Sequence, residues 1–291
     1  MGIKQMTPDS VEQIGSKLVY VVESHEQVLL PWAIERRAAG KPLILITLDH
    51  HTDTNWPFIH RLGSEDDVKS RSLAEIRKFN INDDASMKLC MQEIYNDQQI
   101  RAAIMLNIFE YCFVISHEGT QDTPDSNEMN AYSTALPALM MNKFAARSAD
   151  FSDLPVQPSR PFTYRLPDDR LFIVGHAPGT NSMENPIEDE HLEGRFNIVH
   201  EMSQSTGIFQ SVFEQDYILD FDLDYFHSMR SMKPQESNLL NKLIRNSRAI
   251  TIATEPSYVF QLCEDEEMDS EKQLGAMRAL IETAVSIQGS A

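Results

Sequence analysis

Cysteine is scarce in this chain. Three cysteines occur among its 291 residues, namely Cys90, Cys112 and Cys263. They are odd in number and widely separated, so they form neither a metal-binding pair nor a disulfide framework. We therefore expect free thiols, as in proteins of a reducing compartment.

Long apolar runs are also lacking. A membrane-spanning helix needs about 20 consecutive apolar residues, and no run in the sequence approaches that length. The first segment, MGIKQMTPDSVEQIGSK, has no hydrophobic core of the kind found in secretory signals. We therefore expect a cytoplasmic protein without a membrane partner.

Positive charge is the third scarcity. Lysine and arginine number 25 against 44 aspartates and glutamates, which gives a net charge of −19. Such an acidic protein binds nucleic acid backbones poorly, so nucleic acid is not an expected partner. The charge suits a cationic substrate or peptide, which it would attract over a long range, although solubility alone also accounts for an acidic surface.

Apolar stretches alternate with helical patterns along the chain. KLVYVVESH (17–25) predicts a strand, and 26–40 has helical periodicity with Gly40 as a stop signal. KPLILITLDH (41–50) predicts a strand that is apolar on both faces, as in a parallel sheet covered by helices. The alternation continues with helices at 83–107, 234–248 and 271–287, strands at 110–118, 215–226 and 249–256, and a hairpin at 164–175.

No internal repeat or interdomain linker interrupts this pattern. Residues 119–160 are rich in Ser, Thr, Asn, Asp and Pro, which predicts a loop insertion over the surface with one helix near 136–147. The sequence therefore predicts a single α/β domain over residues 1–291.

The strand at 41–50 leads into the motif DHHTD, in which Asp49, His51 and Asp53 follow the pattern D-x-H-x-D. Alternate residues of an extended strand point to the same side, so these three side chains are expected to converge while His50 points elsewhere. A buried group of two carboxylates and a histidine is costly unless a cation neutralises it. The alternative is a strand end with exposed polar residues.

A second acidic strand, YILDFDLDYF, carries Asp220, Asp222 and Asp224 at alternate positions. On one face of a strand, three carboxylates repel one another strongly unless a cation lies between them. The alternative is an edge strand with a solvated acidic face, but the flanking apolar residues favour a central strand. We therefore favour metal binding.

His25 completes the candidate metal site. It follows the first predicted strand, and ligands gather at the carboxyl ends of strands in parallel α/β sheets. Carboxylates with a little imidazole suit Mn²⁺, with iron or zinc as alternatives. Because so many carboxylates exceed the charge of one divalent ion, two metal ions fit better.

These motifs resemble those of the ureohydrolase family, which includes arginases and agmatinases. DHHTDTNWP resembles the family motif D-A-H-T-D-x-N-x-P, and LDFDLDYF resembles its second motif, D-x-D-x-x-D. The order and setting of the motifs look most like a divergent branch, the peptide arginases. The resemblance implies a three-layer α/β/α sandwich with a mostly parallel central sheet, and two Mn²⁺ ions per chain.

Two departures from the family pattern leave the ligand set open. The family's G-G-D-H around the first histidine is VESH here, and the third acid of the second motif comes one residue early, at Asp224. The strand's metal ligands are therefore either Asp220 and Asp222 or Asp222 and Asp224.

The resemblance also implies a reaction: cleavage of the guanidinium group of arginine residues in a ribosomally made precursor peptide, which leaves ornithine and urea. Glu255 is the candidate for gripping the guanidinium group, and Asn55 matches the position that touches the amino-acid end of the substrate. The departing amine needs a proton from a general acid. The candidates for this role are His60, His117 and His176.

Two other functions remain open on the sequence. One is a zinc-dependent deacetylase of the same broad fold, which would hold a single metal ion. The other is a metal-bearing protein that binds arginine-containing peptides without catalysis. The oligomeric state is also open, with a homo-oligomer among the expectations.

Overall fold

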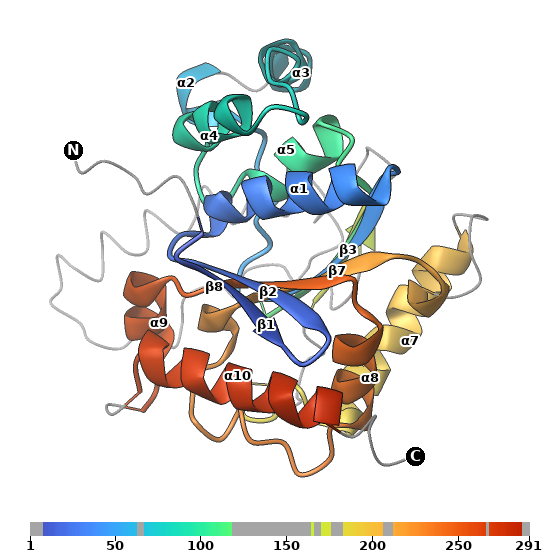
Figure 1. Ribbon diagram of the computed structural model, residues 1–291, viewed down its shortest axis with the longest axis vertical. Coiled ribbons are helices and arrows are strands. Elements are labelled where there is room, and N and C mark those ends of the chain that lie inside the picture. The colour runs from blue at the N-terminus through green and yellow to red at the C-terminus, as the bar shows by residue number, and fades with distance from the viewer. Residues whose placement is uncertain are drawn as a thin grey trace, which may run out of the picture.

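The fold is built around one eight-stranded sheet, seen at the centre of the computed structural model in Figure 1. The model describes residues 8–62, 67–117, 164–165, 170–175, 183–205, 212–265 and 268–286. The strands are β1 (Ser10–Ile14), β2 (Lys17–Val22), β3 (Leu43–Asp49), β4 (Phe109–Ser116), β5 (Tyr164–Arg165), β6 (Leu171–Val174), β7 (Tyr217–Asp222) and β8 (Ala249–Ala253). Six of them run parallel, while β1 and β5 pair antiparallel with β2 and β6 at the two edges.

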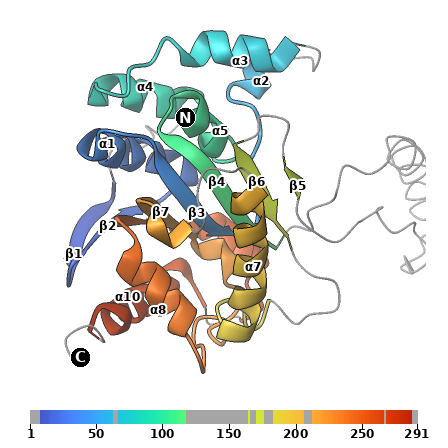
Figure 2. The ribbon, with the colours of Figure 1, turned by 90° about the vertical axis from the view of Figure 1, so that its right-hand side faces the viewer.

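Helices cover both faces of the sheet. The main ones are α1 (Leu29–Ala39), α3 (Val68–Ile76), α4 (Asp84–Glu93), α5 (Gln99–Met105), α7 (Asp189–Ser205), α8 (Asn238–Asn246) and α10 (Ser270–Ser286). Figure 2 shows α1, α4 and α5 on one side of the sheet and α7, α8 and α10 on the other. The predicted three-layer α/β/α fold with a mostly parallel sheet is confirmed.

Two apolar clusters separate these three layers. Strand β3 supplies both, because its successive side chains alternate between the faces: Ile44, Ile46 and Leu48 join one cluster, whereas Leu43 and Leu45 join the other. The whole of β3 is buried, which explains why the sequence there is apolar without interruption.

The strand order brings distant parts of the chain together. The order is β1-β2-β8-β7-β3-β4-β6-β5, so β7 and β8 lie between β2 and β3. The carboxyl ends of β2, β8, β7 and β3 therefore meet at one edge of the sheet, where ligands bind in folds of this kind.

Several elements differ from the sequence-based expectation. The helix expected at 83–107 is two helices, α4 and α5, with a break between them. The sequence reading did not find β1, α3 and α7. The hairpin expected at 164–175 is confirmed by the antiparallel pairing of β5 with β6. The insertion at 119–160 and its helix lie outside the described residues, so the domain bounds stay a prediction.

The described helices include none with both the length and the apolar character needed to cross a membrane.

Candidate metal centre and adjoining pocket

The candidate site lies where four neighbouring strands end. Asp49 and Asp222 are the last residues of β3 and β7. His25 begins a short 3-10 helix, η1 (His25–Val28), shortly after β2, and Glu255 follows β8. Asp224 belongs to a second 3-10 helix, η4 (Leu223–Tyr225).

One group of potential metal ligands consists of His25, Asp49, Asp53 and Asp222. One donor atom from each lies within 4.8 Å of all the others. The centre of the group is Nδ1 of His25, which lies 2.9 Å from Oδ2 of Asp53, 3.1 Å from Oδ2 of Asp222 and 3.4 Å from Oδ2 of Asp49.

A second group adjoins the first and consists of Asp49, His51 and Asp224. Nδ1 of His51 lies 3.0 Å from Oδ2 of Asp224. The backbone N–H of His51 donates to Oδ1 of Asp49 at 2.7 Å, which leaves Oδ2 of Asp49 directed elsewhere. Asp49 therefore belongs to both groups, as a carboxylate bridging two ions would.

The chemistry of these donors fits a pair of divalent cations. Nδ1 of His25 and Oδ2 of Asp49 are buried and make no hydrogen bond to the described residues, although each is strongly polar. The four carboxylates, Asp49, Asp53, Asp222 and Asp224, match the charge of two divalent ions. Carboxylate oxygen with imidazole nitrogen suits manganese and related metals.

In the protein alone, the pKa values of Asp49 and His25 reflect an excess of negative charge in the two ligand groups. Burial raises the pKa of Asp49 well above its usual value, and the neighbouring Asp53, Asp222 and Asp224 raise it further. Burial lowers the pKa of His25, but Asp220 and the other carboxylates outweigh that effect and raise it well above its usual value. A bound cation would place positive charge among these carboxylates, as a protonated His25 does, and would thereby stabilise their charged forms.

Convergence of these residues does not come from strand alternation, and that part of the sequence argument is wrong. Strand β3 ends at Asp49, so His51 and Asp53 lie in the turn that follows, with Asp53 at a φ of 49°. Strand β7 likewise ends at Asp222, and η4 carries Asp224. Turns at the strand ends bring these carboxylates to the site.

His50 stays outside both ligand groups. Its Nδ1 is hydrogen-bonded to Nε2 of His227 at 2.9 Å. Its backbone N–H, however, donates to Oδ1 of Asp224 at 3.2 Å. The residue thus supports a potential ligand through the main chain rather than through its ring.

Asp220 also stays outside both ligand groups, because its carboxylate is already engaged. Its Oδ2 accepts hydrogen bonds from Nε2 of His25 at 2.9 Å and from Oγ1 of Thr47 at 2.8 Å. Its Oδ1 accepts one from Oγ1 of Thr251, which in turn accepts from Nε1 of Trp32 at 3.1 Å. A carboxylate behind a ligating histidine fixes the orientation and tautomer of the ring.

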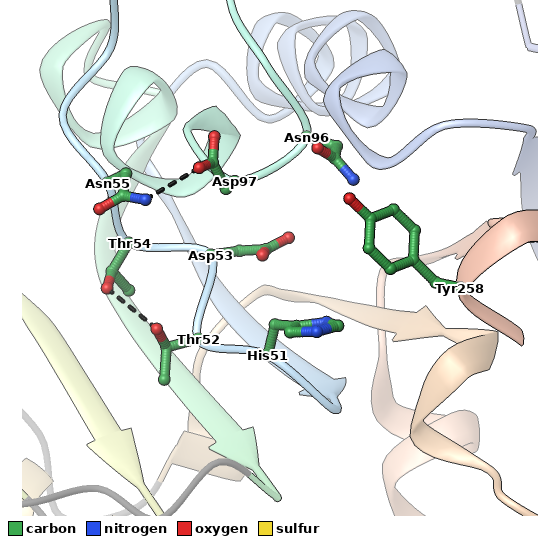
Figure 3. A pocket seen from close by; sticks show the side chains of 8 residues that line it. All are labelled: His51, Thr52, Asp53, Thr54, Asn55, Asn96, Asp97 and Tyr258. Atoms are coloured by element: carbon green, nitrogen blue, oxygen red, sulfur yellow. Dashed lines mark hydrogen bonds between the residues drawn. The ribbon is translucent and has the colours of Figure 1, made fainter. Parts of the chain in front are cut away.

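A pocket of about 290 Å³ opens beside these groups. Figure 3 shows the side chains of His51 and Asp53 extending toward Tyr258 across it. Its wall is polar and consists of His51, Thr52, Asp53, Thr54, Asn55, Asn96, Asp97 and Tyr258. With two aspartates and neither lysine nor arginine among these lining residues, the pocket is suited to a cation.

Asn55, the residue expected to contact the amino-acid end of a substrate, lines this pocket, and its role stays a prediction. Its Nδ2 donates to Oδ2 of Asp97 at 2.8 Å, and its backbone N–H donates to the carbonyl oxygen of Asp97 at 2.9 Å. The amide is therefore held by the chain segment between α4 and α5.

Glu255 is buried at the start of helix α9 (Pro256–Leu262), two residues after β8. Its Oε1 accepts from the backbone N–H of His25 at 2.7 Å and from Nδ2 of Asn96 at 3.2 Å. Burial raises the pKa of Glu255 to about 7 despite these hydrogen bonds. Its φ of 35° is unusual for a residue other than glycine. Such strained backbone conformations are common at functional sites.

The three histidines considered as proton donors have different surroundings. His60 is exposed in the short helix α2 (Ile59–Leu62), and its ring contacts Tyr95. His117 is buried, stacks on Tyr225 with ring centroids 4.1 Å apart, and donates from Nε2 to the Tyr225 carbonyl oxygen. Neither lines the pocket. His176 lies outside the described residues, so the identity of the proton donor stays a prediction.

Five residues of the pocket wall were not predicted as site residues: Thr52 and Thr54 within the DHHTDTNWP motif, and Asn96, Asp97 and Tyr258 outside it. Asn96 and Asp97 are the first two residues of the NDQQ run. They interrupt a predicted helix, and this run of polar residues inside an otherwise apolar pattern was the available signal. Tyr258 lies three residues after Glu255, in a helix that the sequence reading did not predict.

Fold and site together define an α/β protein with a two-centre carboxylate and histidine cluster at the carboxyl ends of its strands. No protein-family model matches the chain, and no curated protein matches it. Among solved structures, proclavaminate amidino hydrolase from Streptomyces clavuligerus is similar over 92% of this chain and 63% of that chain, with 12% identity and a TM-score of 0.39. The chain thus spans less than two thirds of that protein.

Proposed function

We propose that the chain is a binuclear manganese hydrolase of the ureohydrolase superfamily, which converts arginine residues of a precursor peptide to ornithine and urea. The observation that carries this proposal is the pair of ligand groups that share Asp49, next to a polar pocket with two aspartates and no lysine or arginine in its wall. The motifs at residues 49–57 and 219–226, together with His25, add the sequence resemblance.

In this proposal, His25, Asp49, Asp53 and Asp222 hold one ion, and Asp49, His51 and Asp224 hold the other. Divalent ions of this kind lower the pKa of bound water and so supply a nucleophile near neutral pH. The protein must bring the guanidinium carbon to that nucleophile and keep it there.

In this proposal, carboxylates in the pocket wall and directly behind it have this task. The guanidinium group is permanently charged and planar, and it pairs best with carboxylates. Asp53 lies on the wall between the ligand cluster and the pocket, and Glu255 lies behind Asn96. We propose that Glu255 grips the guanidinium group, while Asn55 and Asp97 contact the peptide near the arginine backbone.

Mass spectrometry tests the reaction directly. Protein loaded with Mn²⁺ is incubated with an arginine peptide, and each arginine hydrolysed by a metal-activated water lowers the peptide mass by about 42 Da. Urea must appear in equal amount. The matched control is Asp222→Asn, which removes one proposed ligand and should abolish both signals. An unchanged arginine peptide, with two ions confirmed in the protein, would contradict the proposal.

A zinc deacetylase is the second candidate, because Tyr258 lies in the pocket opposite His51, with ring centroids 5.5 Å apart. Both reactions lower the peptide mass by nearly the same amount, so a peptide with both residues would not distinguish them. The same experiment separates the two functions when one peptide carries only arginine and the other only acetyl-lysine. One zinc per chain and a loss of about 42 Da from the acetyl-lysine peptide alone, by attack of a metal-activated water on the acetyl group, would favour deacetylation. Metal binding without a mass change in either peptide would favour a non-catalytic peptide-binding protein.

A further inference from the structure

The connection between α4 and α5 reaches into the site. The backbone turns extended at Ile94, with φ −105° and ψ 168°, and this ends α4. Ile94 is buried in the apolar cluster beneath. The chain then presents four consecutive polar residues, Asn96, Asp97, Gln98 and Gln99, before and at the start of α5. We call residues 96–99 the NDQQ segment.

The middle of the NDQQ segment holds the loop that follows β3. Besides the two hydrogen bonds between Asn55 and Asp97, Oε1 of Gln98 accepts from the backbone N–H of Phe58 at 2.8 Å. Phe58 has a φ of 65°, a backbone conformation that is sterically unfavourable for a bulky residue. The loop between β3 and α2 therefore depends on external partners for its shape.

Gln99 contacts a potential metal ligand. Its Nε2 donates to Oδ2 of Asp53 at 2.6 Å, and both side chains are buried. The same oxygen of Asp53 lies 2.9 Å from Nδ1 of His25. Because Asp53 also has a positive φ, the hydrogen bond from Gln99 determines where this carboxylate points.

Asn96 makes the corresponding contact on the opposite wall of the pocket. Its Nδ2 and the backbone N–H of His25 both donate to Oε1 of Glu255. Among the described residues no hydrogen bond engages Oε2 of Glu255, and the buried side chain adjoins the pocket lining through Asn96. Asn96 thereby fixes the direction of the carboxylate proposed to grip the guanidinium group.

We propose that the NDQQ segment is one positioning device for both halves of the site: Gln99 positions Asp53 for the metal ion, and Asn96 positions Glu255 for the substrate. The inference rests on the proposed function for its substrate half only. The metal half requires no knowledge of the substrate.

The metal half is tested by calorimetric titration of metal-free protein with Mn²⁺. Gln99→Met keeps the length of the side chain and removes its donor, and we expect apparent Mn²⁺ affinity to fall about 10- to 100-fold, as for other residues that orient metal ligands. Gln92→Met on the exposed side of α4 is the matched control and should bind like the parent. A folded Gln99→Met protein with parental Mn²⁺ affinity would overturn the proposal.

The substrate half is tested with Asn96→Ala, a half-exposed position whose truncation should leave the protein folded even if Gln99→Met does not. We expect parental Mn²⁺ affinity, together with a loss of about 10- to 100-fold in kcat/KM for an arginine peptide, since misplaced catalytic groups cost about that much. Equal loss of Mn²⁺ affinity in Asn96→Ala would show a merely structural role and overturn the division of labour.

The experiments distinguish failure of the proposed function from failure of this inference. If no arginine peptide is hydrolysed by the parent, the proposed function fails. The Mn²⁺ titration of Gln99→Met then still decides the metal half of this inference.

Discussion

At the scale of single residues, three acids of one short stretch have different surroundings. Asp222 and Asp224 direct oxygens toward the two histidines of the ligand groups, whereas Asp220 is fully hydrogen-bonded behind His25. A ligand and a residue that orients a ligand should respond differently to the same substitution.

Asp222→Asn should reduce the Mn²⁺ content after dialysis from two ions per chain to one or none. Asp220→Asn should keep two ions and lose only about 10- to 100-fold in affinity, because it supports His25 rather than an ion. Metal analysis by mass spectrometry, with the melting temperature as a control for folding, measures both. Loss of ions in Asp220→Asn but not in Asp222→Asn would reverse the assignment.

The sequence named all the residues of the two ligand groups but could not rank the three acids of β7 and η4. Alternation treats Asp220, Asp222 and Asp224 as equivalent, and only the end of the strand at Asp222 separates them. The position of Glu255 after a strand is what made it a candidate, and its role stays a prediction. Asn96 and Gln99 were not, because their contacts depend on a break in a helix.

At the scale of elements, the site depends on how helix α1 is fixed to strand β8. Trp32 of α1 donates from its indole N–H to Thr251 of β8, and Thr251 donates to Asp220 of β7. All three side chains are buried. This chain of hydrogen bonds connects a helix, two strands and the histidine of η1, and a buried polar chain is costly to interrupt.

A double-mutant cycle of Trp32→Phe and Thr251→Val measures this connection. Trp32→Phe removes the indole donor to Thr251, and Thr251→Val leaves the buried indole N–H of Trp32 without its acceptor. Because both remove the same hydrogen bond, the two should be coupled by about 0.5–3 kcal/mol in the free energy of unfolding. Urea denaturation of the metal-free proteins gives the four values. Additivity of the two single effects to within about 0.3 kcal/mol would show that the hydrogen bond does not connect the elements.

The sequence predicted the central strands well and the connections between them poorly. Strand β3 reads as a strand because it is apolar on both faces. The helix expected at 83–107 has apolar residues on both sides of the polar run NDQQ, and that run is the one mark of a break, whereas nothing in the sequence singles out the extended residue Ile94 where α4 ends. Helix α7 contains Gly194 and many charged residues, which weaken a helical pattern.

At the scale of the whole molecule, the ligands come from positions as far apart as His25 and Asp224. Unfolded chains do not hold such residues together, so a bound metal ion would stabilise the folded state alone. The protein's charge of −19 would add to this effect, because each bound ion would reduce the self-repulsion of the protein.

Chelation should therefore lower the melting temperature, and Mn²⁺ should restore it. At a free concentration of 100 times Kd, one bound ion contributes about 2.7 kcal/mol to the free energy of unfolding. Differential scanning calorimetry of the protein with EDTA or with Mn²⁺ measures the effect. The Asp49→Asn variant should respond weakly, and an identical melting temperature of the parent in both conditions would argue against a metal centre.

The order of the strands in the sheet could not be predicted from the sequence. It has a consequence for biosynthesis. Strands β2 and β3 leave the ribosome early, but of the two strands that lie between them, β7 begins 168 residues after the end of β3 (217 − 49) and β8 begins 200 residues after it (249 − 49). Until then β2 and β3 each expose an unpaired apolar edge, which promotes association with other chains. A nascent chain therefore carries four of the six potential metal ligands, His25, Asp49, His51 and Asp53, from early on, but the two ligand groups can form only after β7 and β8 have been inserted.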